Sequence, residues 1–167
     1  MKYSFLSLIS VSFLAVASTI SFSSCSHSDH ENFTLIQDKP KIVSVDLGDR
    51  GLSRGDKIYF EANLTLNRRK VGIVLGELVV RGLFPHKAES VLAQQSNGTE
   101  LDFHLEKGDI IALGVTEVAR SSWKIKPNQP STRVIVGGTG EYAGVHGNLI
   151  TTRREDSTFV HEFKFIQ

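Results

Sequence analysis

The only cysteine of this 167-residue chain, Cys25, is placed where a thiol would be modified. Residues 22–25 read FSSC, and small residues before a cysteine are typical of a bacterial lipobox, although Phe22 replaces the usual leucine. A single cysteine excludes an intramolecular disulfide, and acylation would remove a free thiol from an oxidising compartment. We therefore expect Cys25 to be lipidated. Cleavage after Ala17 or near Ser23, without lipidation, is the alternative.

Three residues just after Cys25 have side chains that ligate metals, namely His27, Asp29 and His30. They fall in the polar stretch 26–32, which is typical of a flexible tether. Two histidines on such a tether do not make a preorganised site, so we expect no metal there and no other cofactor.

Residues 137–140 read GGTG and follow a predicted strand, as a phosphate-binding loop would. Such loops present backbone amides at the start of a helix, and the residues that follow have neither helical spacing nor a Gly-Lys-Ser/Thr motif. We expect a hairpin instead, with glycines at positive φ angles and Tyr142 packed on the end of the fold. Serine and histidine residues occur without the spacing that joins a nucleophile to a base, so no hydrolase is indicated.

The N-terminal segment 1–24 has the features of a signal peptide: one basic residue, Lys2, no acidic residue, and an apolar run interrupted by serines. The run is short for a transmembrane helix. The sequence therefore predicts an exported protein, held at the cell envelope as a membrane-anchored lipoprotein or else secreted in soluble form. It divides the chain into a signal peptide, 1–24, a tether and leading segment, 25–40, and one domain, 41–167.

The charge balance argues against a nucleic-acid partner. The chain has 19 lysine and arginine residues and 18 aspartate and glutamate residues, and the charge is balanced once Lys2 leaves with the signal peptide. Nucleic-acid binding needs clustered basic charge, which this composition does not indicate.

Alternation of apolar and polar residues with period two indicates strands throughout the rest of the chain. The alternation is clearest in Lys57–Leu66, which reads KIYFEANLTL. The segment 71–83 is long and contains Gly72, Gly76 and Gly82, a pattern typical of a bent strand. The other predicted strands are 41–47, 89–95, 100–105, 109–119, 132–136, 147–153 and 158–165.

Many strands joined by short turns, without helical periodicity, predict an all-β sandwich or barrel. Long strands bent at glycines favour the barrel, because closure of a sheet requires tight coiling. We therefore expect one all-β domain, most simply an antiparallel β-barrel.

Two parts of the chain carry a resemblance to a known family. The first runs from Val45-Asp46-Leu47-Gly48 through Gly55-Asp56 and Phe60 to 69–72, and the second, 136–147, reads VGGTGEYAGVHG. In this order and separation, over roughly residues 41–165, they resemble the allene oxide cyclase barrel-like and dirigent-like superfamily. The resemblance implies an eight-stranded antiparallel β-barrel with a central apolar cavity, which agrees with the predicted strands.

The resemblance also points to candidate catalytic residues, since plant members use a few polar side chains inside the cavity. At the positions of the acid and the arginine of dirigent-like members this chain has Gly140 and His146, and the acid of the first cyclase strand corresponds to Asp46. Histidine is a common general acid or base in enzymes, and His146 would serve in that role. We take Asp46 and His146 as catalytic candidates. A structural role for Asp46 in the nearby turn and a surface position for His146 are the alternatives.

Cavity-lining residues follow from the same comparison. The cyclase pattern has a tyrosine where this chain has Thr116 and a cysteine where it has Leu78. If the glycine face of 71–83 lines the cavity, the lining residues are Val74, Gly76, Leu78, Val80 and Thr116. Glu77 and Arg81 then point outward, where they would support subunit contacts in a homotrimer, as in family members that form trimers.

Two functional hypotheses follow. In the first, the exported barrel is a binding module of the cell envelope that holds a small hydrophobic ligand in its cavity. In the second, it is an orientation catalyst, either an isomerase or cyclase or a dirigent-type guide of stereoselective coupling. Replacement of most plant catalytic positions favours binding and leaves enzyme activity undecided. A structural barrel with a filled core is the third reading.

Overall fold

The computed structural model describes residues 30–48, 50, 53–83, 94–119 and 125–166. Within these ranges the protein consists of nine strands and one short 3-10 turn, η1 (Gly140–Tyr142). The strands are β1 (Phe33–Gln37), β2 (Lys41–Val45), β3 (Lys57–Leu66), β4 (Arg69–Leu83), β5 (Gln94–Leu105), β6 (Gly108–Ala119), β7 (Pro130–Gly138), β8 (Gly147–Arg153) and β9 (Phe159–Phe165). The predicted signal peptide and Cys25 lie outside the described residues. Among the described residues, no helix is long and apolar enough to span a membrane.

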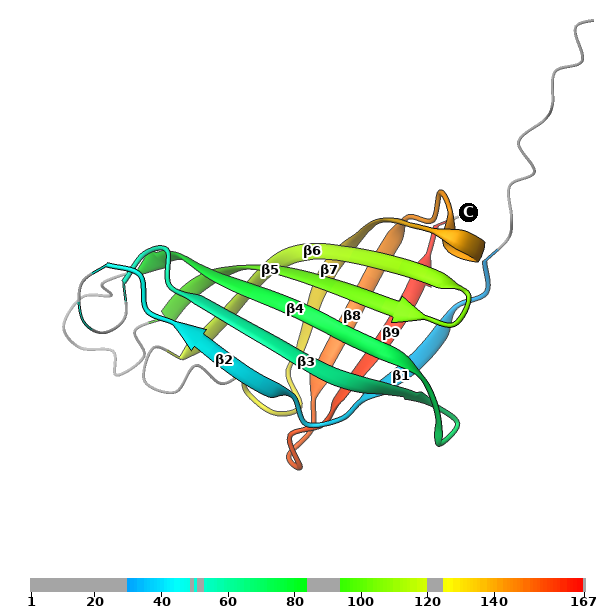
Figure 1. The fold of residues 1–167 in the computed structure, drawn as a ribbon, viewed down its shortest axis with the longest axis horizontal. Coiled ribbons are helices and arrows are strands. Elements are labelled where there is room, and N and C mark those ends of the chain that lie inside the picture. The colour runs from blue at the N-terminus through cyan, green and yellow to red at the C-terminus, as the bar shows by residue number, and fades with distance from the viewer. Residues whose placement is uncertain (1–29, 49, 51–52, 84–93, 120–124, 167) are drawn as a thin grey trace, which may run out of the picture.

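The strands form one antiparallel sheet in the order β1-β9-β8-β7-β6-β5-β4-β3-β2. The sheet closes because β1 pairs with β9 along one edge and with the end of β3 along the other, where Ile36 lies opposite Thr65. The result is a closed eight-stranded barrel, with β2 as an additional strand that pairs with β3 (Figure 1). The predicted all-β antiparallel barrel is therefore confirmed.

Several strand bounds shift by one or two residues from the sequence prediction, and two differences are larger. β1 lies inside the segment 25–40 that the sequence assigned to the tether, because five residues between polar flanks are too few to show a clear period. β5 runs through residues 96–99, which separate two of the predicted strands, and Gly98 pairs directly with Val115 of β6. The predicted strand 89–95 lies almost entirely outside the described residues.

Alternation positions the side chains of β3 as the sequence predicted. Ile58, Ala62 and Leu64 are buried, whereas Glu61 and Asn63 are exposed. A Cβ at Gly76 of β4 would lie 2.1 Å from the Phe60 ring, so the missing side chain makes room for that ring. This contact explains one of the glycines that bend β4.

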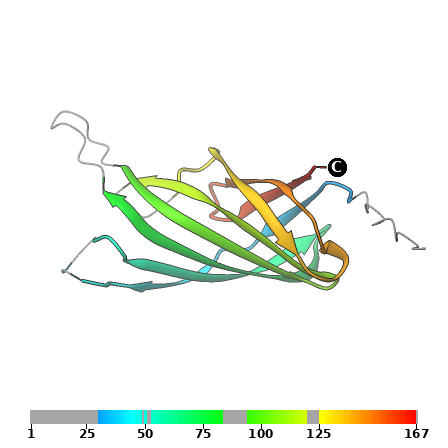
Figure 2. The ribbon, with the colours of Figure 1, turned by 90° about the horizontal axis from the view of Figure 1, so that it is seen from above.

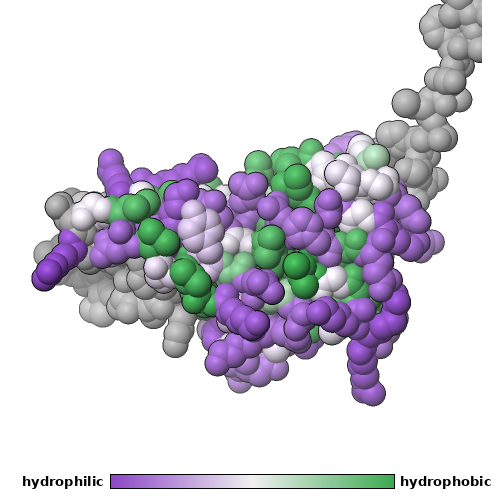
Figure 3. All heavy atoms as spheres, viewed as in Figure 1, coloured by the Kyte–Doolittle hydropathy of each residue, from purple (hydrophilic) through white to green (hydrophobic). Residues whose placement is uncertain are grey.

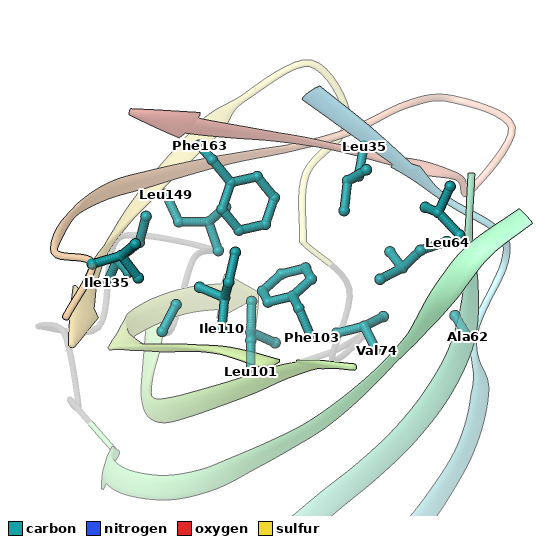
Figure 4. Close-up of a cluster of buried hydrophobic side chains, with 13 residues drawn as sticks. Leu35, Ala62, Leu64, Val74, Leu101, Phe103, Ile110, Ile135, Leu149 and Phe163 are labelled. Carbon is teal, nitrogen blue, oxygen red and sulfur yellow. The ribbon is translucent and has the colours of Figure 1, made fainter. Parts of the chain in front are cut away.

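Apolar side chains fill one half of the barrel interior (Figure 4). Phe103 and Phe163 have no exposed surface, and their rings meet edge to face with centroids 5.0 Å apart. Phe33 stacks on Phe163 at 4.5 Å. We call the buried residues of this cluster the apolar half; they are Leu35, Ala62, Leu64, Val71, Val74, Leu101, Phe103, Ile110, Ala112, Ile135, Val145, Leu149 and Phe163.

The segment between β7 and β8 closes the barrel at the apolar half. Gly140, Gly144 and Gly147 have φ angles of 60°, 81° and 152°, which confirms the expectation of glycines in left-handed conformations. The connection contains η1 rather than a simple hairpin. Tyr142 packs against the apolar half, with its ring 6.1 Å from that of Phe33, as the sequence predicted.

At the opposite end of the barrel from the β7–β8 connection, one set of strands extends farther than the rest. β2 to β6 continue beyond β7, β8, β9 and β1, and the turned view shows this extension as two diverging arms (Figure 2). Ile42 of β2 lies opposite Phe60 and therefore faces the interior side of the sheet, yet it is 60% exposed. The interior side of the sheet is thus accessible to solvent at this end.

Candidate functional site

In the part of the chain that the structure describes, six polar side chains are buried inside the barrel, each from a different strand. We call them the polar belt; they are Gln37 of β1, Thr99 of β5, Thr116 of β6, Arg133 of β7, Thr151 of β8 and His161 of β9. None is more than 5% exposed. Buried polar residues are uncommon unless they form hydrogen bonds, so a ring of them inside a barrel indicates a special environment.

Strand alternation places the polar belt directly beside the apolar half. Residues two apart on a strand face the same side. Arg133 precedes Ile135 by two positions, and His161 precedes Phe163 in the same way. Gln37, Thr99 and Thr151 have the same relation to Leu35, Leu101 and Leu149. The sequence predicted an apolar interior, whereas the layer next to the apolar half carries six buried polar residues on β1 and β5 to β9, with the apolar Leu78 of β4 opposite Thr99.

His161 is held by hydrogen bonds at both ring nitrogens. Its Nε2 lies 2.8 Å from Oε1 of Gln37, and its Nδ1 lies 3.0 Å from Oγ1 of Thr151. With a carbonyl oxygen facing Nε2, that nitrogen carries the proton, and the Thr151 hydroxyl donates to Nδ1. The Phe103 ring meets the imidazole edge to face at 5.0 Å. His161 is therefore fixed in one tautomer and one orientation.

Arg133 belongs to the second hydrogen-bonded group of the polar belt. Its Nη2 donates to Oγ1 of Thr116 at 2.5 Å, and the Thr99 hydroxyl donates to the same oxygen at 2.9 Å. The arginine stem crosses Gly114, where a Cβ would lie 2.7 Å from Cγ of Arg133. The glycine thus leaves the space that lets Arg133 turn into the interior.

The polar belt carries one positive charge at neutral pH. Burial, together with the positive charge of Arg133, lowers the pKa of His161 to about 3, so the imidazole is neutral. Burial lowers the pKa of Arg133 to about 10, which still leaves the guanidinium protonated near pH 7.

That charge has no counter-ion among the residues that the structure describes. No ion pair there involves Arg133, and its Nε and Nη1 are buried without a hydrogen-bond acceptor. Nε and Nη1 together carry three of the five guanidinium N–H groups. A buried donor without a partner destabilises a protein by roughly 1–3 kcal/mol, and more when it is charged. The polar belt therefore offers unused donors to a ligand.

Asp102 has the other orphaned atom, Oδ1, but it cannot serve as the missing partner. Its neighbours on β5, Leu101 and Phe103, are buried in the apolar half, so Asp102 points to the outside of the barrel. Arg133 and Asp102 thus face opposite sides of the barrel wall.

The predicted lining residues lie on the inner face. Val74, Leu78 and Val80 are buried, and Gly76 lies against the Phe60 ring. Thr116, which the family comparison selected, is part of the polar belt and accepts the hydrogen bond from Arg133.

The predicted catalytic residues do not share a site. Asp46 follows β2 at one end of the barrel, whereas His146 precedes β8 at the other end, and both are exposed. Nδ1 of His146 lies 3.4 Å from the Gly144 carbonyl oxygen. Neither residue belongs to the polar belt, and their catalytic roles stay predictions.

The turn beside Asp46 is organised by Asp56. The Asp56 carboxylate accepts hydrogen bonds from the Ser53 amide at 2.6 Å and from the Leu47 amide at 2.9 Å. These backbone hydrogen bonds, Ser53 first and then Leu47, lower the pKa of Asp56. Asp56 therefore holds this turn by hydrogen bonds, and the structural role that the sequence allowed for Asp46 stays a prediction.

The outer surface is where the subunits of the predicted homotrimer would meet. Glu77 points outward and forms an ion pair with Lys57 at 2.7 Å. On the face formed by β2 to β6, apolar residues are interspersed with polar ones (Figure 3). Leu113 and Val115 of β6 and Val134 of β7 are 41%, 53% and 56% exposed. The homotrimer stays a prediction.

Comparison with known proteins gives a fold but no family. No family model and no curated protein matches the chain. Among solved structures, a pyocyanin demethylase is 26% identical, with a TM-score of 0.62, over 81% of this chain and 100% of the demethylase chain. A cyclase described as nonspecifically heme-binding, which catalyses a [4 + 2] cycloaddition in neoabyssomicin biosynthesis, is 8% identical, with a TM-score of 0.56, over 82% of this chain and 66% of its own.

A third solved structure, an exo-specific intermolecular Diels-Alderase, is 15% identical, with a TM-score of 0.50, over 81% of this chain and 98% of its own. The chain therefore has a barrel fold that known cyclases and a demethylase also have. Membership of the allene oxide cyclase superfamily stays a prediction.

Proposed function

We propose that the protein binds a small, mostly apolar molecule inside the barrel and orients it for a rearrangement or cyclisation. The polar belt carries this proposal, since it places unused Arg133 donors beside an apolar wall. Small-molecule sites are concave and mostly apolar, with a few polar groups that fix orientation. Of the two functions predicted from the sequence, this proposal favours the orientation catalyst over the simple binding module.

The chemistry that the polar belt supports is electrostatic. Donors held in a buried site stabilise negative charge as it develops on a substrate oxygen, because they need no reorganisation and little water screens them. Arg133 is placed for this role. His161 is not proposed as an acid or base, because both of its nitrogens are engaged by Gln37 and Thr151. It holds the neighbouring side chains in position.

The names of similar structures support a small-molecule substrate. The pyocyanin demethylase is the neighbour with 26% identity, and this chain covers it completely. A planar, ring-containing molecule such as pyocyanin is therefore the first compound to test.

The location of the protein is proposed from its sequence alone. An exported barrel anchored through Cys25 would present its site at the cell envelope. The superfamily resemblance is proposed on the same ground. Substitution Cys25→Ala should move the protein from the membrane fraction to the soluble fraction, as measured by immunoblot. Unchanged membrane association would refute lipidation.

The binding proposal is tested by extracting the purified full-length protein with organic solvent and identifying small molecules by mass spectrometry. We expect a compact apolar compound in wild-type protein and a large loss of it in Arg133→Met. The control is Arg69→Met, because Arg69 lies on the surface, paired with Glu106. The proposal fails if the extract is empty and titration with ring compounds, including pyocyanin, gives no heat. A structural barrel would then remain.

A further inference from the structure

We infer that the natural ligand is a compact monocarboxylate whose carboxylate binds Arg133 of the polar belt. The inference rests on the proposed function and specifies its substrate class. It stands on the charge, the donor geometry and the packing of the barrel interior.

The first step is the charge of the inner face. Among the described residues that face inward and are at least partly buried, the charged ones are Asp56, Arg133 and Arg153; Arg69, opposite Leu66 at the start of β4, also has inward parity but is exposed and paired with Glu106. Asp56 is at the end of β3 and is already satisfied by Ser53 and the Leu47 amide. Arg153 donates to the Ile125 carbonyl and to the Ser157 hydroxyl at the end of β8. Arg133 alone of these three keeps orphaned polar atoms.

The second step is the shape of the unused donors. Nε and Nη1 of Arg133 are both free of acceptors in the described part of the chain. A planar guanidinium matches a carboxylate, which accepts two N–H groups at once. A neutral carbonyl oxygen offers one acceptor atom and leaves the buried charge without compensation. The carboxylate is therefore favoured over an amide, ester or ketone.

The other residues of the polar belt limit the ligand to one negative charge. The neutral His161 presents no second cation, and its ring nitrogens are already hydrogen-bonded. The Thr99 hydroxyl donates to Thr116. A second carboxylate would be buried without a partner, which costs several kcal/mol. A dicarboxylate or a phosphate ester should therefore bind worse than a monocarboxylate.

The packing of the interior limits the shape of the ligand's apolar part. The apolar half is filled by its own side chains, since Phe103, Ile135, Leu149 and Phe163 have no exposed surface. A ligand held at Arg133 cannot extend a long alkyl chain into that half. The adjoining side chains include the rings of Phe103 and Phe159, at 5.0 and 6.5 Å from the His161 ring. These rings favour a ring-containing ligand, because aromatic groups gain from stacked or edge-to-face contacts.

The test compares 2-naphthoate with 2-naphthamide, which has nearly the same shape and no charge. Isothermal titration of the full-length protein should give a Kd at least about tenfold lower for 2-naphthoate. Arg133→Met should abolish this preference, and Arg133→Lys should keep part of it, because lysine retains the charge. Arg69→Met, on the surface, should leave the preference unchanged. Laurate should bind more weakly than 2-naphthoate.

Each other outcome overturns a defined statement. Equal affinity for 2-naphthoate and 2-naphthamide would overturn the carboxylate inference and leave the proposed function standing. A preference that persists in Arg133→Met would assign the recognition to another group and also overturn it. Tighter binding of laurate would refute the compact body. If no compound binds, the proposed function fails together with the inference. The wild-type comparison decides the matter even if Arg133→Met does not fold.

Discussion

The two layers of the barrel interior differ in how their side chains are satisfied. In the apolar half, Phe103 and Phe163 pack with no exposed surface, and nothing there needs a partner. In the polar belt, two positions away along most of the same strands, Arg133 is buried with unused donors. The same alternation builds both layers, but only the first is complete by itself. The apolar half stabilises the fold. The polar belt holds a buried, unpaired charge that destabilises the free protein but provides hydrogen-bond donors for a ligand.

The largest effect is expected in the apolar half. Phe103→Ala should lower the free energy of unfolding by about 3–5 kcal/mol, because it leaves a cavity among fully buried neighbours. Urea denaturation measures this. Val136→Ala, at a position 51% exposed, is the control and should change little. A loss below about 1 kcal/mol for Phe103→Ala would mean that the apolar half is loosely packed.

The strand pattern predicted the fold because closure of a barrel depends on the alternation and the bends of its strands. Period-two alternation in Lys57–Leu66 and the glycines of β4 suffice to indicate a closed barrel. The polar belt was harder to predict. Residues 132–136 read TRVIV, and the face with Val134 and Val136 is the more apolar one. Judged by sequence, Arg133 belongs outside, whereas the structure exposes Val134 and Val136 and buries Arg133.

His161 shows the opposite case. In β9, Phe159, His161 and Phe163 share one face and Glu162 lies on the other, so its inward position follows from alternation. Its partners do not follow, since Gln37 belongs to a strand that the sequence did not show and lies 124 positions away. Asp46 and His146 were selected because they occupy positions of catalytic residues in the superfamily that the sequence resembles. Such a correspondence does not show where this barrel buries a charge.

The second prediction concerns the wall that positions Arg133. Gly114→Ala should destabilise the protein by about 2 kcal/mol, because its Cβ would overlap Cγ of Arg133. In an Arg133→Ala background that Cγ is absent, and the penalty should fall by about 1 kcal/mol. Gly137→Ala is the matched control, since a Cβ there has no atom within 4 Å. Equal penalties in both backgrounds would show that Gly114 does not make room for Arg133.

The third prediction uses the buried imidazole. The pKa of His161 is about 3 in the folded protein and near 6.5 in the unfolded chain, so the unfolded state binds the extra proton between these values. The unfolding free energy should therefore fall as pH drops through this window, by about 2 kcal/mol from pH 6.5 to pH 5 for this group.

His161→Gln, which does not titrate, should lack that part of the pH dependence while keeping polar contacts to Thr151 and Gln37. His146→Gln, at an exposed position, is the control and should follow the wild-type curve. Parallel curves for wild type and His161→Gln would contradict a buried neutral imidazole.

The central claim is that Arg133 is unsatisfied in the free protein and becomes satisfied by a bound carboxylate. The most direct test is the unfolding free energy of wild type and Arg133→Met, each with and without saturating 2-naphthoate. Without ligand, Arg133→Met should be as stable as wild type or more stable, by about 1–2 kcal/mol, because an unpaired buried cation is removed. With ligand, wild type should become the more stable protein, because only it binds the carboxylate tightly. An Arg133→Met variant that is less stable than wild type by the same amount in both conditions would contradict the account.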